Sequence, residues 1–306
     1  MLIVRREYRS SLPGPEYSIE ELLEYGVVVV DKHRGPTSSQ VTAYVRDLFK
    51  AKKAGHGGTL DPNVSGVLPV LLNRASRLSK YLLEAGKEYV AYVKFHSPVD
   101  ERTLLKALRL FTGPIYQKPP VRSAVSRRLR IRHVYEFELI EFTGREALIR
   151  RSVESGTYIR KLVHDIGLYI GVMAHMAELR RIRAGPFREE EALNVLELRC
   201  LKEKYDETGE EKYLRLAIRP PEDAVRHLPK IYVTDPAARS ISHGGKLFAP
   251  GVVAFTDDLK KGSYVALMTA KGRLIAIGIS LVSAEELKEM KKGEVARPKT
   301  VLLPAF

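Results

Sequence analysis

Cysteine is nearly absent from this 306-residue chain, because Cys200 is the only one. A single cysteine excludes an intramolecular disulfide and a cysteine-rich zinc cluster. It also excludes the zinc deaminases of nucleobases, which need paired cysteines around their metal. No stretch approaches the ~20 apolar residues that span a bilayer, and Met1 to Ser10 lacks the apolar run of a signal peptide. We therefore expect a cytoplasmic protein with no membrane association.

Acidic residues are in short supply relative to basic ones. There are 37 Asp and Glu against 51 Lys and Arg, which gives a formal net charge of +14 and a pI near 9.7. Such a balance suits a partner made of phosphates, although ribosomal, membrane-surface and thermophile proteins share it. Since single cores stop growing near ~250–300 residues, the length favours two domains.

The most informative segment is the glycine-rich stretch Gly55–Val70. Within it, Pro62 disfavours the helical conformation for Asp61, and the glycines let the backbone turn tightly and approach a ligand. Asp-Pro alone is also ordinary turn chemistry. The longer string predicts a loop that presents Asp61 into a cleft.

Gly55–Val70 resembles the catalytic loop of the pseudouridine synthases that include the bacterial T-loop tRNA enzyme and the box H/ACA enzyme of the dyskerin family. The Pro-Asn-Val-Ser-Gly string that follows Asp61 looks more like the dyskerin branch. Further segments match the family in order over nearly the whole chain: Asp31–Ser38, Lys87–Tyr89, Gln117–Arg128, Ser155–Arg160 and Glu178–Phe187. His33-Arg34 stands where the family has prolines, which affects the shape of that loop and not the chemistry.

The pattern and the resemblance together predict an α+β protein of three parts. Residues 1–18 form an N-terminal extension that packs on the C-terminal domain, and 19–228 form a pseudouridine synthase mixed-sheet catalytic domain with a central cleft. Residues 229–306 form a small β-barrel that resembles the PUA RNA-binding domain, because short apolar strands alternate with Gly-containing turns. The less hydrophobic stretch Lys202–Glu211 is expected to be a protruding loop.

The resemblance implies three catalytic residues, Asp61, Arg160 and Tyr158, and no metal or other cofactor. Asp61 is the essential carboxylate, whether it adds to the base, attacks the sugar or acts by a glycal route. Because burial alone would protonate a carboxylate, we predict an ion pair across the cleft in which Arg160 grips Asp61 with two hydrogen bonds. The Tyr158 hydroxyl would assist proton transfer.

A uridine in structured RNA must be flipped out to react, and aromatic stacking recovers part of that cost. By its motif, Tyr89 is the expected stacking ring, and Leu179, in a segment expected to be helical, would be an apolar pocket wall. His56 and Lys32 are assigned to substrate binding with a lesser role. The arginines expected to track phosphates, for which a solvated basic face is the alternative, are Arg128, Arg130, Arg132, Arg180, Arg181 and Arg183.

The function that the resemblance implies is RNA-guided conversion of uridine to pseudouridine in rRNA, by the catalytic subunit of an archaeal box H/ACA ribonucleoprotein. Its implied partners are the guide RNA, the substrate rRNA, a small zinc-ribbon-like protein, a glycine-arginine-family protein and a kink-turn-binding ribosomal-type protein. One alternative is a guide-independent synthase acting on the tRNA T-loop. Another is a non-catalytic RNA-binding scaffold for ribosome assembly. The target uridines and the guide are not encoded in these motifs.

Overall fold

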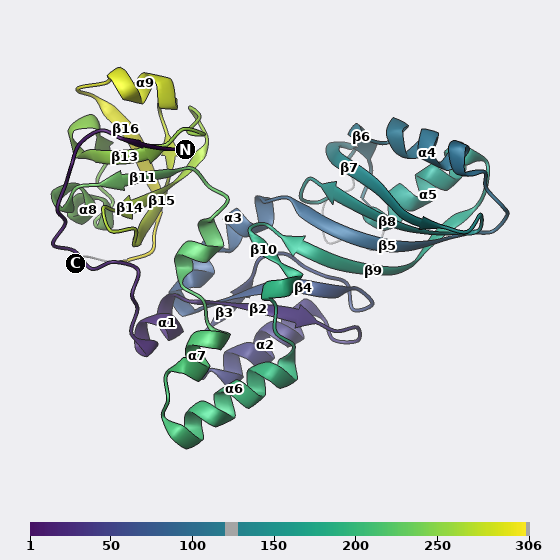
Figure 1. The fold of residues 1–306 in the computed structure, drawn as a ribbon, viewed down its shortest axis with the longest axis horizontal. Helices are drawn as coiled ribbons and strands as arrows, with labels where there is room; N and C mark the ends of the chain where they lie inside the picture. The colour runs from purple at the N-terminus through teal and green to yellow at the C-terminus, as the bar shows by residue number, and fades with distance from the viewer. Residues whose placement is uncertain (120–127, 304–306) are drawn as a thin grey trace.

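The computed structural model describes residues 1–119 and 128–303, and it contains two sheets (Figure 1). The predicted loop between Gln117 and Arg128 therefore lies mostly outside the described residues. The larger sheet has nine strands in the order β2-β4-β9-β5-β8-β7-β6, with β3 paired to β4 and β10 to β9. Their bounds are β2 (Val27–Lys32), β3 (Ala54–His56), β4 (Ser65–Leu72), β5 (Lys87–Phe95), β6 (Gly113–Gln117), β7 (Arg130–Phe142), β8 (Glu146–Val153), β9 (Ala174–Ala184) and β10 (Phe187–Arg188).

The smaller sheet has seven strands in the order β1-β13-β11-β14-β15-β16-β12, and it curls into a barrel-like body (Figure 1). Most of its pairs are antiparallel, but β11 and β14 run parallel, as β4 and β9 do in the larger sheet. Both sheets are therefore mixed. The bounds are β1 (Leu2–Val4), β11 (Lys230–Val233), β12 (Leu247–Phe248), β13 (Val252–Thr256), β14 (Tyr264–Thr269), β15 (Leu274–Ser280) and β16 (Glu294–Val301).

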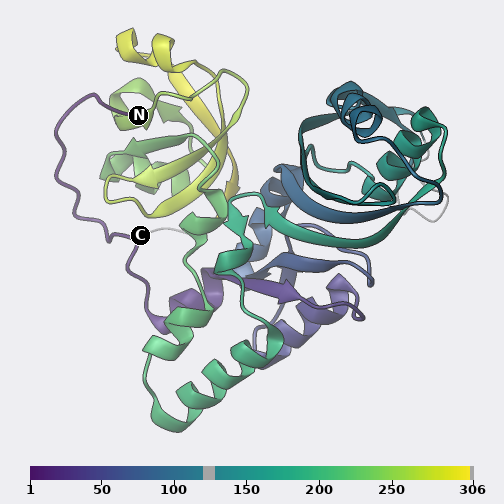
Figure 2. The ribbon, with the colours of Figure 1, turned by 45° about the vertical axis from the view of Figure 1, so that its right-hand side comes forward.

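The helices lie beside the sheets, and several of them start at side-chain caps. Thr37 and Gln40, for example, form a reciprocal capping box at the start of α2. Helices α4 and α5 lie against the concave face of the β5 to β9 region, which curls around them (Figure 2). The helices are α1 (Ile19–Tyr25), α2 (Ser38–Leu48), α3 (Ser79–Glu84), α4 (Glu101–Leu110), α5 (Ile159–Ile170), α6 (Val195–Thr208), α7 (Lys212–Ala217), α8 (Asp235–Ser242) and α9 (Ala284–Glu289).

The prediction of an α+β fold with a mixed sheet and a small β-barrel is confirmed, and two local predictions are wrong. The stretch Lys202–Glu211 is mostly helical, because α6 runs to Thr208, begins at an Asn194 cap and ends at Gly209 in the left-handed conformation. The segment around Leu179 is strand β9 and not a helix.

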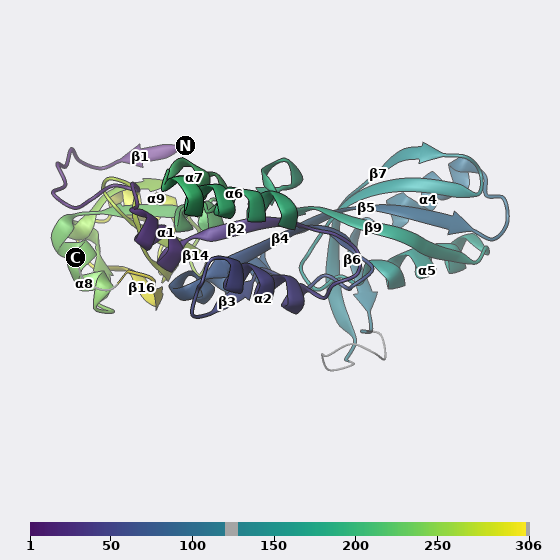
Figure 3. The same cartoon turned by 90° about the horizontal axis from the view of Figure 1, so that it is seen from below.

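Strand β1 carries the start of the chain to the barrel, where Leu2 to Val4 pair antiparallel with β13 (Figure 3). The segment that follows is fastened at α8, because the Asp235 carboxylate accepts hydrogen bonds from the Ser10 hydroxyl and from the amide and hydroxyl of Ser11 at 2.6–2.7 Å. The first residues are therefore part of the C-terminal sheet.

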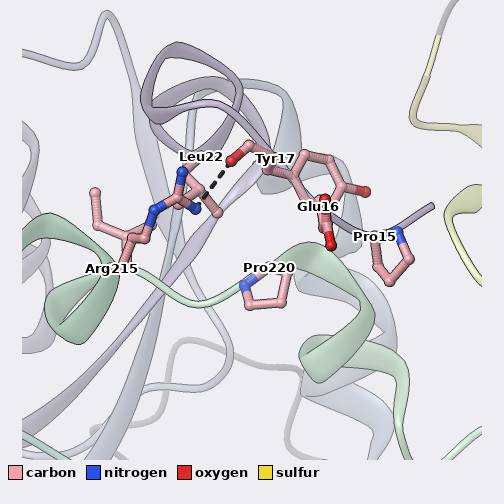
Figure 4. A pocket seen from close by; sticks show the side chains of 7 residues that line it. Pro15, Glu16, Tyr17, Leu22, Arg215 and Pro220 are labelled. Carbon is pink, nitrogen blue, oxygen red and sulfur yellow. Dashed lines mark hydrogen bonds between the residues drawn. The ribbon is translucent and has the colours of Figure 1, made fainter. Parts of the chain in front are cut away.

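A cavity of about 440 Å³ lies where this segment meets α1 and the chain after α7 (Figure 4). The Arg215 guanidinium closes one side by donating a hydrogen bond of 2.9 Å to the Tyr17 carbonyl. None of the predicted site residues lines it; the lining residues are Pro15, Glu16, Tyr17, Leu22, Arg215, Ile218 and Pro220. In the part of the chain that the structure describes, no helix combines the length and apolar character needed to cross a membrane.

Candidate active site

The loop that carries Asp61 joins β3 to β4 and is fixed to the start of α2. The Ser38 hydroxyl donates to the Leu60 carbonyl at 3.0 Å and accepts from the Leu60 amide at 2.7 Å. On the other side of Asp61, the Gly35 amide donates to the Pro62 carbonyl at 2.9 Å. The residues next to Asp61 are thus held on both sides, and its side chain projects outward.

Glycine is required at the end of this loop. At Gly66 the backbone has φ +108°, and a Cβ there would lie 2.1 Å from the Arg181 carbonyl oxygen. Strand β9 passes this close because it pairs in parallel with β4 at Ser65 and Gly66. The Ser65-Gly66 pair in the motif therefore lets β9 approach the loop.

The predicted Asp61–Arg160 ion pair is present, with Nη2 of Arg160 2.7 Å from Oδ2 of Asp61. Arg160 lies in the first turn of α5. Two features differ from the prediction. A single hydrogen bond joins the pair, and the two side chains are 58% and 62% exposed, so the carboxylate is not buried in the free chain.

Tyr158 immediately precedes α5 and is half-buried. Its backbone is clamped by the Gln117 side chain, whose amide oxygen accepts from the Tyr158 amide at 2.9 Å and whose nitrogen donates to the Tyr158 carbonyl at 3.1 Å. Gln117 is 2% exposed. Gln117 begins a segment that matches the family, but the sequence does not indicate that its amide contacts the backbone of Tyr158.

Tyr89 lies on β5, half-buried against the core of the larger sheet. In the strand register it is flanked by two arginines, Arg151 of β8 and Arg181 of β9. Leu179 is buried on the same strand as Arg181, with 8% of its surface exposed. Tyr89 is therefore only partly covered by the core in the free chain.

The prediction that Lys32 binds substrate is wrong for this structure, because the side chain is completely buried. Its Nζ donates to the carbonyl oxygens of His33, at 2.9 Å, and Pro62, at 3.3 Å. Burial lowers the pKa of Lys32, and the Asp61 charge opposes that change. Lys32 therefore stabilises the loop from the protein interior, through its hydrogen bond to the Pro62 carbonyl.

His56, on β3, is half-buried, and its Nδ1 has no hydrogen-bond partner. Burial and, to a lesser degree, the Arg181 charge lower the pKa of the imidazole.

Lys87 was not assigned a role by sequence, yet it is buried beside the loop and donates to the carbonyls of Leu82, Leu83 and Ala85. Burial, with Arg181 and Arg183 nearby, lowers the pKa of Lys87 to about 7.

The arginines predicted to track phosphates fall into two groups. Those of Glu178–Phe187 are engaged within the protein: Arg181 is 1% exposed, Arg180 holds Asp31 at 2.9 and 3.0 Å, and Arg183 holds Glu88 at 2.7 Å. The prediction is wrong for Arg181, whose burial keeps it from RNA. Carboxylate partners already neutralise Arg180 and Arg183.

The arginines of β7 and of the two residues before it are more accessible, and exposed apolar side chains alternate with them. Arg128 is exposed and Arg130 is half-buried, while Arg132 is half-buried against Glu154 at 3.3 Å. The alternating Leu129 and Ile131 point outward, with 64% and 57% of their surfaces exposed. At the start of β7 the apolar side chains therefore face solvent, whereas Val134, Phe137 and Leu139 farther along pack against the core.

Three family models match consecutive parts of the chain. They are described as TruB family pseudouridylate synthase N-terminal domain (residues 46–159), tRNA pseudouridylate synthase B C-terminal domain (160–226) and PUA domain (229–302). Among curated proteins, one named "Probable tRNA pseudouridine synthase B" from Pyrococcus horikoshii is 48% identical over 95% of this chain and 88% of its own length. One of the same name from Methanopyrus kandleri is 44% identical over 98% and 89%.

Solved structures match over the whole length as well. A chain of the "Cbf5-Nop10-Gar1 Complex" is 44% identical and superposes with a TM-score of 0.94 over 99% of this chain and 94% of that one. A chain of an "H/ACA RNP bound to a substrate RNA containing 2'-deoxyuridine" is 42% identical, with a TM-score of 0.92 over 99% and 95%.

Proposed function

The chain belongs to the TruB family of pseudouridylate synthases, and on that premise we propose that it acts as the catalytic subunit of a box H/ACA ribonucleoprotein. In that particle a guide RNA selects the uridine in rRNA that the protein isomerises. The observation that carries the proposal is the TM-score of 0.94 to a chain of the Cbf5-Nop10-Gar1 complex, spanning 99% of this chain.

The reaction breaks the glycosidic bond of uridine, turns the uracil and rejoins it to the sugar through carbon. We assign the essential carboxylate to Asp61, as a nucleophile on base or sugar or as the base of a glycal route. In the free chain water solvates this carboxylate. When RNA covers the loop the water leaves, and Arg160 then provides the adjacent cation that a desolvated carboxylate needs to stay ionised.

Substrate RNA would complete the site that is open in the free chain. We assign Tyr89 as the ring on which the flipped uracil stacks, which recovers ~1–3 kcal/mol of the cost of unstacking. Tyr158, fixed by Gln117, would present its hydroxyl beside Arg160 for proton transfer. Leu179 would form the apolar wall, and Arg128, Arg130 and Arg132 would contact phosphates.

We propose the domain division 1–18, 19–228 and 229–306, supported by the pairing of β1 with β13 and by the separate family models. The partners would be the guide and substrate RNAs and counterparts of the Nop10 and Gar1 proteins in the matched complex. A kink-turn-binding protein would complete the particle. We place this particle in the cytoplasm, where an archaeal cell such as those of its relatives assembles its ribosomes.

A second function has direct support from the names of the relatives, which are tRNA pseudouridine synthases. The same active site would serve a guide-independent reaction on the tRNA T-loop. The two functions differ in their requirement for guide RNA and not in their chemistry.

The test is pseudouridine formation on a guide-matched RNA and on tRNA, with wild type and Asp61→Asn, with and without guide and partner proteins. We expect guide-dependent product with wild type and none with Asp61→Asn. Product on tRNA without guide would establish the second function. Tight RNA binding without product in any combination would leave a non-catalytic scaffold and overturn the proposal.

A further inference from the structure

Arg181 is a buried cation whose partners are unusual. It lies on β9, 1% exposed, directly below the loop that carries Asp61. Its guanidinium donates from Nε to the Val67 carbonyl at 2.8 Å, from Nη2 to the Gly58 carbonyl at 3.0 Å and from Nη1 to the Thr59 carbonyl at 3.5 Å. One side chain therefore holds the chain on both sides of Asp61.

Across the part of the chain that the structure describes, Arg181 forms no ion pair with a carboxylate, in contrast to its neighbours Arg180 and Arg183. A buried charge is costly unless it is compensated. Here the compensation comes from the dipoles of loop carbonyls, so the loop geometry and the position of this guanidinium depend on each other. A glycine at Gly58, with φ +139°, is needed for that carbonyl to turn inward.

The same guanidinium also reaches Tyr89. The two residues are direct neighbours in the register of β5 and β9, and the Tyr89 hydroxyl opposes the lowering of the Arg181 pKa by burial. The other supports of the loop, Ser38 and Lys32, bind Leu60 and Pro62 and make no hydrogen bond to Tyr89 among the described residues. Arg181 thus connects the loop to the aromatic ring.

We propose that Arg181 is a positioning residue of the pseudouridylation site, which fixes the Asp61 loop relative to the Tyr89 ring. This inference rests on the proposed function, since it assigns Asp61 and Tyr89 their roles. The distance between the Asp61 carboxylate and the uracil stacked on Tyr89 is then fixed as soon as the uridine binds. A misplacement of about 1 Å in such a pair costs on the order of 100-fold in rate.

The test compares Arg181→Lys with wild type in the reconstituted particle, under single-turnover conditions. Lys keeps the charge but lacks the planar fork that lets the guanidinium bind the three loop carbonyls together. We expect the rate to fall by about 10- to 100-fold, while the dissociation constant for substrate RNA changes by less than threefold. The matched control is Arg215→Lys, which also removes a guanidinium hydrogen bond to a carbonyl, that of Tyr17, far from the loop; its rate should equal that of wild type.

A double-mutant cycle with Tyr89→Phe tests the connection itself. If Arg181 acts through Tyr89, the double variant should be no slower than the slower single variant, because both changes break the same link. All rates are measured below the melting transitions of every variant, so a less stable protein still reports on the reaction.

Three results would overturn the inference: a rate for Arg181→Lys within twofold of wild type, a loss of RNA affinity that accounts for the loss of rate, or effects that multiply in the double variant. The proposed function fails separately, if Asp61→Asn retains activity in the same assay. An inactive Asp61→Asn beside a fully active Arg181→Lys would refute only the role of Arg181.

Discussion

Replacing Arg151 with Met should make the protein more stable. The side chain is 1% exposed on β8, and its Nε, Nη1 and Nη2 atoms have no hydrogen-bond partner among the residues that the structure describes. Burial lowers the pKa of Arg151 to about 9, while the Tyr89 hydroxyl beside it acts in the opposite direction. This buried, unpaired charge therefore lowers the free energy of unfolding.

The magnitude follows from linkage. The guanidinium pKa is several units higher in the unfolded chain than in the folded one, so keeping the charge buried at pH 7 costs at most about 5 kcal/mol. Replacements of buried charges by apolar side chains of similar volume stabilise proteins by up to about 1–4 kcal/mol. We expect Arg151→Met to raise the free energy of unfolding by that amount at pH 7.

The gain should also depend on pH. Because the folded pKa lies below the unfolded one, the unfolded chain binds the proton more tightly. Wild-type stability therefore rises as the pH increases from about 9 toward the higher guanidinium pKa of the unfolded chain. The advantage of the variant should be complete at neutral pH and shrink above about pH 9.

Denaturant-induced unfolding at neutral pH and near pH ~10.5 measures both effects. The control is Arg150→Met, the preceding residue, whose exposed side chain pairs with Glu138 at 3.4 Å; a surface pair of this kind contributes ~0–1 kcal/mol. A less stable Arg151→Met at pH 7, or a gain that does not shrink with pH, would refute the reasoning. A more stable but slower enzyme would show that the charge beside Tyr89 serves the reaction.

Three further changes have defined outcomes. Arg160→Lys should leave the free energy of unfolding within about 1 kcal/mol of wild type, because the pair is exposed, yet lower the single-turnover rate at least tenfold; near-native turnover would argue against the pair. Tyr89→Ala should weaken substrate RNA binding by about 1–3 kcal/mol, measured by titration, whereas Tyr89→Phe should preserve it; equal affinities would count against stacking. Asp235→Ala should expose residues 1–17 to limited proteolysis. Hydrogen bonds from Ser10 and Ser11 hold the pKa of Asp235 below its ordinary value despite burial, so acidification through that folded pKa should expose the same residues in wild type. Unchanged cleavage would show that β1 alone secures the segment.

The hydrophobic pattern predicted the C-terminal β-barrel, in which short apolar strands alternate with Gly-containing turns. It failed for α6, whose helix depends less on an apolar stripe than on caps and on pairs such as Arg199 with Glu203. It also could not orient β7. Alternation shows that a strand has two faces, but only the surroundings decide that the Arg132 face packs against Glu154 while Ile131 faces solvent.

The motifs predicted which residues gather at the site better than what each contacts. The Asp61–Arg160 pair lies where the pattern indicated. Lys32 and Arg181 could not be distinguished from substrate-binding cations, because a sequence does not show that loop carbonyls turn inward to meet them. Gln117 gave no signal at all, since its contact is to the backbone of Tyr158.

The pairing of β1 with β13 has a consequence for how the chain is made. Leu2 opposes Thr256, a partner that the ribosome adds more than two hundred residues later. At ~5–20 residues per second, the first strand waits for ten seconds or more before its partner emerges. Until then Leu2, Ile3 and Val4 form an unpaired strand, followed directly by charged residues from Arg5 onward. Completion of the C-terminal sheet thus requires β1 to meet a strand made more than two hundred residues later, which places β1 docking late in folding.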